Sequence, residues 1–145
     1  MLDVDVLGAA LAPDAPPRAE IRRLCVAAAS CAGIAAAHVA IEFADEQRIT
    51  ELNWKHRGLA EPTDVLSFPI DGVEPLAPAS AASDRGVLEA PPMRELGDVV
   101  ICAQHTSDVR EAIVHGMLHL LGMDHETDSG EMLALQQRLL RAERP

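Results

Sequence analysis

Residues 115–125, HGMLHLLGMDH, constrain the fold and chemistry of this chain more than any other stretch. His115 and His119 are four residues apart, so an α-helix would project both side chains from one face, about 6 Å apart. Gly122 is suited to end that helix, because glycine adopts the left-handed conformation found just past the last turn. The chain can then turn back and bring His125 to the pair. The segment therefore predicts a helix, a turn and three imidazoles that face a common point.

Three neutral imidazoles with a fourth position left to water are typical of a catalytic zinc site, since a structural site normally has a fourth protein ligand. We therefore expect His115, His119 and His125 to bind one Zn²⁺ ion. Nickel, cobalt or copper would also suit three imidazoles, so the native metal stays open. The same histidine spacing occurs in metzincin proteases, but Gly116 stands where those proteases carry their general-base glutamate. A zinc peptidase remains an alternative that lacks its base.

The chain has 145 residues, which is enough for one domain with one hydrophobic core. It contains no run of about 18 apolar residues that would span a membrane. Its first residues, MLDVDVL, lack the basic and apolar segments of a secretion signal, so we expect a cytoplasmic protein. Cys25, Cys31 and Cys102 are odd in number and have no CxxC spacing, and we expect all three to be small core residues.

The charge of the chain limits how it can meet a nucleic acid. Twelve basic residues against 23 acidic ones give a net charge of −11. Such a protein is repelled by bulk nucleic acid unless its few cations are clustered. Trp54, Phe43 and Phe68 are too few for a platform that stacks successive bases. An RNA substrate would therefore need a local binding surface, or presentation by a ribosomal particle or partner proteins.

Hydrophobic periodicity and turn residues divide the chain into strands and helices. Asp45 and Ser107 are expected to cap two helices, and Asp128 with Glu131 to form the capping box of a third, while Gly58 ends the first of them. The expected elements are a strand at 2–7, a helix at 18–31, strands at 39–43, 62–69 and 96–102, a helix at 46–56, the histidine helix, and a final helix with Met132, Leu135, Leu139 and Leu140 on its apolar face.

Residues 71–95 differ from the rest because prolines and an alanine and serine cluster interrupt any sustained period. We interpret them as one long loop rich in proline and alanine. His38, His56 and His105 lack the spacing of a metal-binding group and are expected to be packing or surface residues, although His56 could line a cleft beside Arg57.

Three separated blocks of sequence resemble one known family. They are LNWKHRGLAEPTDVLSFP at 52–69, LGDVVI at 96–101 and HGMLHLLGMDH at 115–125. Together they cover about a quarter of the chain, in the order of the YbeY family, which are metal-dependent endoribonucleases of bacterial rRNA maturation. The resemblance implies a single α+β domain over residues 1–145, with a small mixed β-sheet packed against helices and a zincin-like metal helix and turn.

The resemblance also implies function. It places the metal ligands on His115, His119 and His125 and a functionally important arginine on Arg57. The activity implied is a single-strand-specific, metal-dependent endoribonuclease in 16S rRNA 3′-end maturation and ribosome quality control. The implied partners are single-stranded rRNA and the small ribosomal subunit or 70S ribosome with its assembly proteins, with neither membrane nor DNA expected. A ribosome-assembly factor with a mainly structural zinc is the stronger of the two alternatives, ahead of the zinc peptidase.

The chemistry of these groups gives Arg57 a role. A guanidinium can hold a phosphate through two parallel hydrogen bonds and stabilise the charge that builds up during its cleavage. Zinc lowers the pKa of its bound water to about 7, so this water could attack phosphorus, or the RNA 2′-hydroxyl could attack with zinc assisting. The sequence leaves both routes open. Asp124 could either orient an imidazole or simply cap the turn.

Overall fold

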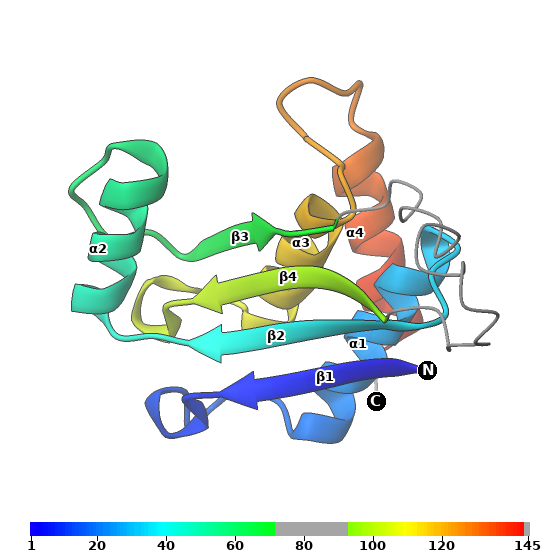
Figure 1. Ribbon diagram of the computed structural model, residues 1–145, viewed down its shortest axis with the longest axis horizontal. Helices are drawn as coiled ribbons and strands as arrows, with labels where there is room; N and C mark the ends of the chain where they lie inside the picture. Colours follow the sequence, from blue (N-terminus) through cyan, green and yellow to red (C-terminus); the bar gives the residue numbers. More distant parts are fainter. Residues whose placement is uncertain (72–92, 144–145) are drawn as a thin grey trace, which may run out of the picture.

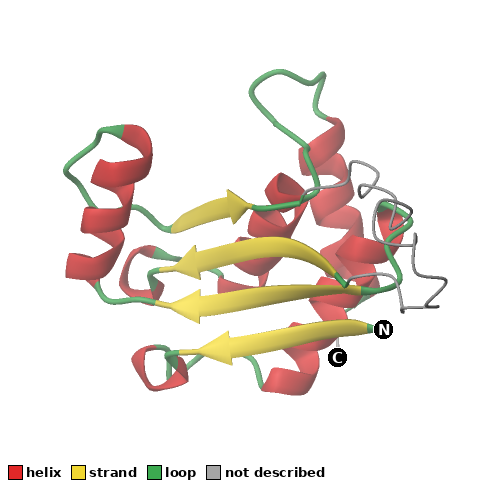
Figure 2. Ribbon diagram, in the orientation of Figure 1, coloured by secondary structure: helices red, strands yellow, loops and turns green. Residues whose placement is uncertain are grey.

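A four-stranded mixed sheet organises the structure, a computed structural model that describes residues 1–71 and 93–143 (Figure 1, Figure 2). The strand order is β1-β2-β4-β3. β1 pairs with β2 and β2 with β4 in parallel, whereas β3 runs antiparallel to β4. The elements are β1 (Leu2–Leu7), α1 (Arg18–Cys31), β2 (Ala37–Phe43), α2 (Glu46–Arg57), β3 (Val65–Pro69), β4 (Arg94–Ile101), α3 (Val109–Leu120) and α4 (Glu131–Ala142). The predicted α+β class with a small mixed sheet is confirmed.

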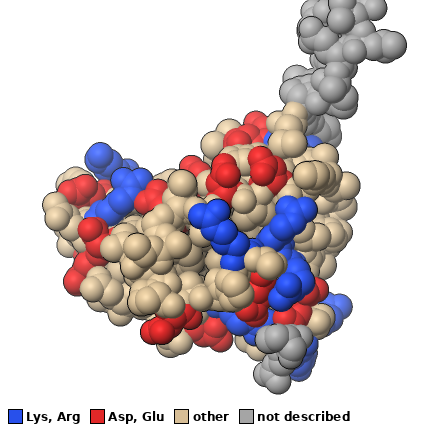
Figure 3. Space-filling model, turned by 90° about the horizontal axis from the view of Figure 1, so that it is seen from below, with Lys and Arg blue, Asp and Glu red and all other residues tan. Residues whose placement is uncertain are grey.

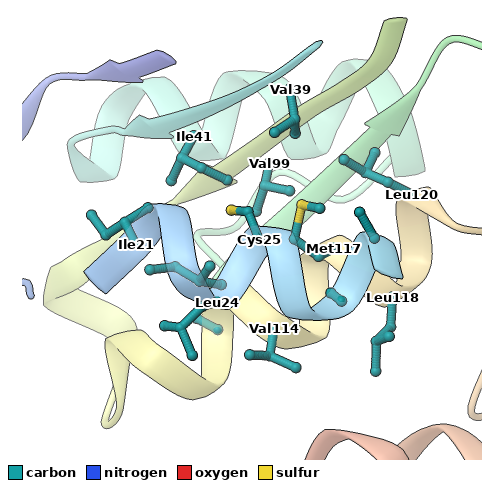
Figure 4. Packing of buried hydrophobic residues seen from close by; sticks show 14 of the residues in the cluster. Ile21, Leu24, Cys25, Val39, Ile41, Val99, Val114, Met117, Leu118 and Leu120 are labelled. Carbon is teal, nitrogen blue, oxygen red and sulfur yellow. The ribbon is translucent and has the colours of Figure 1, made fainter. Parts of the chain in front are cut away.

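The main core lies between the sheet and the helices α1, α3 and α4. Successive residues of a strand point to opposite faces, so Val39 and Ile41 of β2 and Val99 of β4 point to the same side. They meet the apolar stripe of α1 and the inner face of α3 (Figure 4). The labelled residues that make this contact are Ile21, Leu24, Cys25, Val114, Met117, Leu118 and Leu120.

A second, smaller core holds α2 near one end of the opposite sheet face. Ile49 of α2 packs with Leu66 of β3 and Val100 of β4 in this cluster. Because Val99 belongs to the main core and Val100 to the second, β4 is buried on both faces here. The two clusters fix where α2 stands relative to α3.

Gly97 marks an irregularity in the pairing of β4 with β2. The register skips one residue between His38 and Val39, whose partners are Glu95 and Gly97. Gly97 has φ 129°, and a Cβ added there would lie 2.1 Å from the carbonyl oxygen of Phe68. Only glycine fits this approach between strands, which explains the glycine in the LGDVVI block.

The helix boundaries agree with prediction more closely than their caps do. The Asp45 side chain accepts a hydrogen bond from the Arg48 amide at 2.8 Å, and Gly58 ends α2 in the left-handed region, as predicted. The prediction that Ser107 caps α3 is wrong, since the N-cap is Asp108, whose side chain accepts from the Glu111 amide. Asp108 stands one residue nearer the first helical residue, where its carboxylate reaches that amide.

The predicted capping box of α4 is also wrong in its detail. The N-cap residue is Gly130, which has no side-chain oxygen. Asp128 accepts from the Gly130 and Met132 amides instead, and Glu131 accepts from the amide of Ser129 rather than from that of Asp128. The same carboxylates therefore satisfy the first turn from a bend that begins two residues earlier.

The expectations for the three cysteines and for the loop at 71–95 are met only in part. Cys25 and Cys102 are buried as expected, and burial raises the pKa of the Cys25 thiol to about 12. Cys31 is exposed, because α1 ends there and turns its last residue to solvent. Most of the loop predicted at 71–95 falls on residues 72–92, outside the described residues, and its last two positions belong to β4.

Charge is unevenly distributed over the surface. Figure 3 shows Lys and Arg side chains gathered in separate groups on the face seen from below, with Asp and Glu beside them. The acidic excess of the chain therefore leaves local basic areas. Among the described residues, no helix is long and apolar enough to cross a membrane.

Gly116 lets α3 lie directly against the sheet. A Cβ at this position would lie 2.4 Å from Cγ1 of Val99 and 3.3 Å from Oγ of Ser67. The Ser67 hydroxyl donates a hydrogen bond to the carbonyl oxygen of Gly116 at 2.8 Å, which joins β3 to the middle of α3. The absence of a side chain at 116 thus sets the distance between helix and sheet.

We predict that Gly116→Ala lowers the free energy of unfolding by about 1–3 kcal/mol, because the added methyl group overpacks the interface with Val99. Denaturant unfolding of Gly116→Ala, Val99→Ala and the double variant tests the cause. The free energy of unfolding of the double variant should fall by less than the sum of the two single losses, because the shorter side chain at 99 makes room for the methyl group. Strictly additive losses would show that Val99 does not set this distance.

His38 joins three strands on the sheet face opposite the main core. Its Nε2 lies 2.8 Å from Asp5 of β1, and its Nδ1 lies 2.6 Å from Glu95 of β4. Both ring nitrogens can donate only in the imidazolium form. The hydrogen bond to Asp5, and then that to Glu95, raise the pKa of His38 above its ordinary value, although desolvation opposes them.

The stabilisation by His38 should therefore depend on pH. A raised folded-state pKa adds stability that is complete below the unfolded-state pKa of about 6.5 and is lost as pH rises through the folded-state value. We predict that His38→Gln lowers the free energy of unfolding more at pH 6 than at pH 9. Asp5→Asn should remove much of this pH dependence. Parallel stability curves for wild type and His38→Gln would contradict the prediction.

Candidate metal centre

The helix α3 carries His115 and His119 on the face that its apolar residues leave free. The buried residues of α3 pack into the core, while both histidines remain partly exposed. Just after the helix, Gly122 adopts φ 90° and donates its amide to the carbonyl of His119, and the Met123 amide bonds to the carbonyl of Leu118. This glycine turn is the one predicted, and it reverses the chain toward the histidine pair.

The three predicted ligands come together. Nitrogen atoms of His115, His119 and His125, one from each ring, all lie within 4.8 Å of one another. The Nε2 atoms of His115 and His119 are 3.1 Å apart. Two nitrogens bound to one tetrahedral zinc ion at about 2.0–2.1 Å are about 3.3 Å apart, so this pair has nearly the spacing that zinc requires.

Hydrogen bonds at the other ring nitrogens orient the pair. Nδ1 of His119 lies 3.0 Å from the carbonyl oxygen of Met123. A carbonyl only accepts, so Nδ1 carries the proton and the Nε2 of neutral His119 holds a lone pair. Nδ1 of His115 lies 2.8 Å from Oε1 of Gln136 on α4, an arrangement that likewise leaves Nε2 free. Both free nitrogens meet at the same place.

His125 supplies the observation that tests whether a metal fits. Its Nδ1 is buried and has no hydrogen-bond partner within the described part of the chain. A buried polar atom without a partner costs about 1–3 kcal/mol, so such atoms require an explanation. A cation between the three rings would bond to one nitrogen of each, and the Nε2 atoms of His115 and His119 already face one another. The donor set of three imidazoles therefore fits zinc or a similar transition metal.

The surroundings favour neutral imidazoles. Burial, and next the neighbouring His115, lower the pKa of His119 below its ordinary value. A neutral ring is the form that binds a metal, since a protonated nitrogen has no lone pair to offer.

Asp124 shapes the turn that carries His125. Its Oδ1 accepts a hydrogen bond from the amide of Glu126 at 2.9 Å, and its carbonyl accepts from the amides of Thr127 and Asp128. Of the two roles considered for Asp124, the geometry shows the one within the turn, and no described imidazole is hydrogen-bonded to its carboxylate. Met123 and Gln136 orient the rings instead.

A cleft of about 700 Å³ lies over the three histidines. In Figure 1 the end of α2 and the segment after α3 rise at opposite ends of β3. The cleft is lined by residues of these segments and of α3, including His56, Arg57, Asp64, Ser67 and the three clustered histidines. The sequence block at 52–69 thus meets the block at 115–125 across one concave surface.

Arg57 lies at the last position of α2, where the chain beyond it is held firmly. Gly58 donates its amide to Trp54, and the buried Asn53 donates its side-chain amide to the carbonyl of Glu61 at 2.8 Å. The guanidinium of Arg57 is exposed and forms no ion pair or hydrogen bond with any residue that the structure describes. It is therefore available to an anion in the cleft.

His56 lines the same cleft, as the sequence allowed. Its ring packs on Phe68 of β3, with the ring centroids 4.7 Å apart. His38 and His105 lie elsewhere and pair with carboxylates, the latter with Glu46 at 3.1 Å.

The position of the missing general base is now clear. Gly116 lies between His115 and His119 in sequence but contacts the sheet, where an added Cβ would meet Val99 at 2.4 Å. A glutamate has no room there. The general-base glutamate with which a metzincin protease activates its water therefore cannot stand at this position.

Gln136 is the residue of the site that sequence reasoning missed. It is only 2% exposed and is one of the few polar residues buried in the described structure. Its sequence signal is a polar side chain four residues after Met132 and three before Leu139, within an otherwise apolar stripe. A buried amide on such a stripe indicates a specific hydrogen-bond partner.

Comparison with known proteins shows the family of this chain. The model of a family described as Endoribonuclease YbeY matches residues 17–143. Proteins named Endoribonuclease YbeY include one from Macrococcus caseolyticus, 34% identical over 98% of this chain and 96% of its own length. Another, from Symbiobacterium thermophilum, is 38% identical over 70% of this chain and 69% of its own length.

Other matches cover different shares. The Endoribonuclease YbeY of Helicobacter hepaticus is 36% identical over 68% of this chain, and the match spans 63% of that protein, less than two thirds of its length. A solution structure of a Thermotoga maritima protein is similar with a TM-score of 0.49 and 23% identity, over 97% of this chain and 88% of that one. The family match covers far more than half of the residues, and this chain belongs to the endoribonuclease YbeY family.

Proposed function

We propose that this protein is a zinc-dependent endoribonuclease that cleaves single-stranded rRNA, matures the 3′ end of 16S rRNA and takes part in ribosome quality control. Membership of an endoribonuclease family supports an RNA-cleaving role in rRNA processing. The observation that carries the zinc-dependent chemistry is the convergence of three imidazoles on one point, with two Nε2 atoms 3.1 Å apart.

In this proposal, some residues around the cleft bind the metal and others orient the metal ligands. His115, His119 and His125 would hold the ion, and the carbonyl of Met123 and the amide of Gln136 keep two of the rings turned toward it. Zinc, when bound, supplies a Lewis acid for a phosphate oxygen and lowers the pKa of a coordinated water to about 7. This chemistry requires no protein base at the position of Gly116.

Arg57 is proposed to bind the scissile phosphate across the cleft. Its guanidinium donors are bonded to no residue of the described ranges, and it lines the same cleft as the histidines. Two parallel N–H donors match two phosphate oxygens and stabilise the added negative charge of the transition state. His56 lines the cleft beside it, with its ring packed on Phe68.

Partners follow from the charge of the protein. With a net charge of −11, the chain gains little from long-range attraction to RNA. We propose that the substrate is presented by the small ribosomal subunit or the 70S ribosome with assembly proteins, in the cytoplasm, and that DNA and membranes are not targets.

Our first functional prediction concerns Arg57. Arg57→Ala should lower the rate of cleavage of a single-stranded fragment from the 16S rRNA 3′ end by roughly 10²–10³-fold, as removal of one transition-state donor group does elsewhere. Zinc content should not change, because Arg57 contacts none of the histidines. Arg23→Ala, an exposed arginine on α1, is the matched control and should keep the wild-type rate.

Metal content and rate together decide the outcome. If Arg57→Ala loses zinc in proportion to activity, the residue is structural. If the control variant loses as much activity as Arg57→Ala, the effect reflects total charge rather than a phosphate contact in the cleft.

The route of attack can be tested on the substrate. A fragment with a single 2′-deoxy substitution at the cleaved nucleotide removes the internal nucleophile and leaves the phosphate unchanged. Continued cleavage at that bond would show attack by water, and its loss would show attack by the 2′-hydroxyl. The protein residues named above are the same in both routes.

The rival function is a ribosome-assembly factor whose metal is mainly structural. It predicts that removal of zinc unfolds the protein, because metal binding then contributes to folding free energy. In this structure the buried face of α3 packs into a core that contains no metal ligand, so we expect metal-free protein and His119→Ala to keep their helical content. Circular dichroism after removal of the metal by a chelator distinguishes the two functions. Loss of the helical signal would favour the assembly factor.

A zinc peptidase is disfavoured by the packing of Gly116 against Val99, which leaves no place for a general base. Incubation with casein should give no cleavage by zinc-loaded protein.

A further inference from the structure

Gln136 connects the last helix to the candidate metal centre. It lies on α4, is 2% exposed, and its Oε1 is 2.8 Å from Nδ1 of His115. On the same face of α4, Met132, Leu139 and Leu140 pack into the main core. Burial of an amide among apolar side chains costs free energy unless its polar atoms are bonded, so an apolar residue would fill this place at lower cost. The presence of a glutamine at this buried position therefore requires an explanation.

The reason lies in the tautomer of His115. Its Nε2 lies 3.1 Å from Nε2 of His119, and the latter holds a lone pair because His119 donates its Nδ1 proton to Met123. Without constraint, neutral His115 could place its own proton on Nε2 and donate it to His119. That tautomer would remove one metal ligand. An acceptor at Nδ1 instead keeps the proton there and leaves Nε2 free for an ion.

The three ligands are held by different means. A backbone carbonyl fixes His119, and this contact survives any substitution at 123 that preserves the turn. The buried Nδ1 of His125 has no hydrogen-bond partner among the residues that the structure describes. Gln136 is thus the one described side chain whose hydrogen bond orients a ring of this triad.

We propose that Gln136 is a positioning residue of the metal centre, whose side-chain carbonyl holds His115 in the tautomer and orientation that present Nε2 to the metal and so couples α4 to metal binding. This inference rests on the metal-binding part of the proposed function and does not depend on which substrate is cleaved.

The amide also matches the charge that a phosphate substrate requires. A glutamate here would accept the same proton but add a negative charge beside the ion. A carboxylate partner makes the imidazole a stronger ligand and reduces the positive charge that the centre offers to a phosphate. Glutamine orients His115 while leaving the centre more cationic.

The experiment measures metal binding on purified full-length protein, without RNA. Gln136→Met keeps an unbranched side chain of similar length but has no strong acceptor, whereas Gln136→Glu keeps the acceptor. Gln137→Met is the matched control, because residue 137 is the exposed neighbour on the same helix. Zinc dissociation constants are measured by competition with a chromophoric chelator, and ligand geometry is followed in the visible absorption of the Co²⁺-substituted proteins.

We expect Gln136→Met to bind zinc about 10–100-fold more weakly and to change the Co²⁺ spectrum, as loss of such a hydrogen bond does at other metal sites. Gln136→Glu should bind zinc at least as tightly as wild type, and Gln137→Met should match wild type in both measurements. A packing role would affect stability but leave the zinc affinity and Co²⁺ spectrum of Gln136→Met unchanged, and that result would overturn the proposal.

Two further outcomes are decisive. If Gln136→Met does not fold, Gln136→Glu decides alone, and weaker zinc binding by a folded Gln136→Glu protein would overturn the proposal. If the wild-type chain binds no zinc or cobalt, both this inference and the zinc-dependent function fail. If it binds metal with the predicted order of variants but cleaves no RNA, only the proposed nuclease function fails.

Discussion

The packing of α3 directly on the sheet is the constraint on which the site depends. Gly116 has no side chain, so the helix approaches Val99 closely and accepts a hydrogen bond from Ser67 at its middle. His115 and His119, on either side of Gly116 along the helix, then project away from the core toward the cleft. One residue therefore sets the distance of the histidine helix from the sheet and also removes the place where a metzincin protease would carry its base.

The cleft exists because two cores fix two helices independently. The main core holds α1, α3 and α4 on one sheet face, and the second core holds α2 near the end of the other. β3 belongs to both, since Ser67 contacts α3 while Leu66 packs with α2. The short edge strand thereby brings Arg57 and the histidines to one concave surface.

Polar contacts around the rings prepare them for a cation before one arrives. A carbonyl and a buried amide hold protons on the outer nitrogens of His119 and His115, and burial lowers the pKa of His119. Lone pairs that face one another are unfavourable without a positive charge between them. A bound metal would offset the free-energy cost of this arrangement, as our proposal requires.

The sequence by itself determined the element order, the glycine turn and the three histidines, because these follow from local periodicity and from spacing along one helix. It also indicated Arg57, through resemblance of its block to a known family. Only the tertiary structure decided that Gln136 faces His115, that His38 joins three strands, and that Asp108 and Gly130 begin α3 and α4. These contacts join residues distant in sequence or depend on the exact bend of a turn. Local patterns do not encode which distant polar group a side chain will meet.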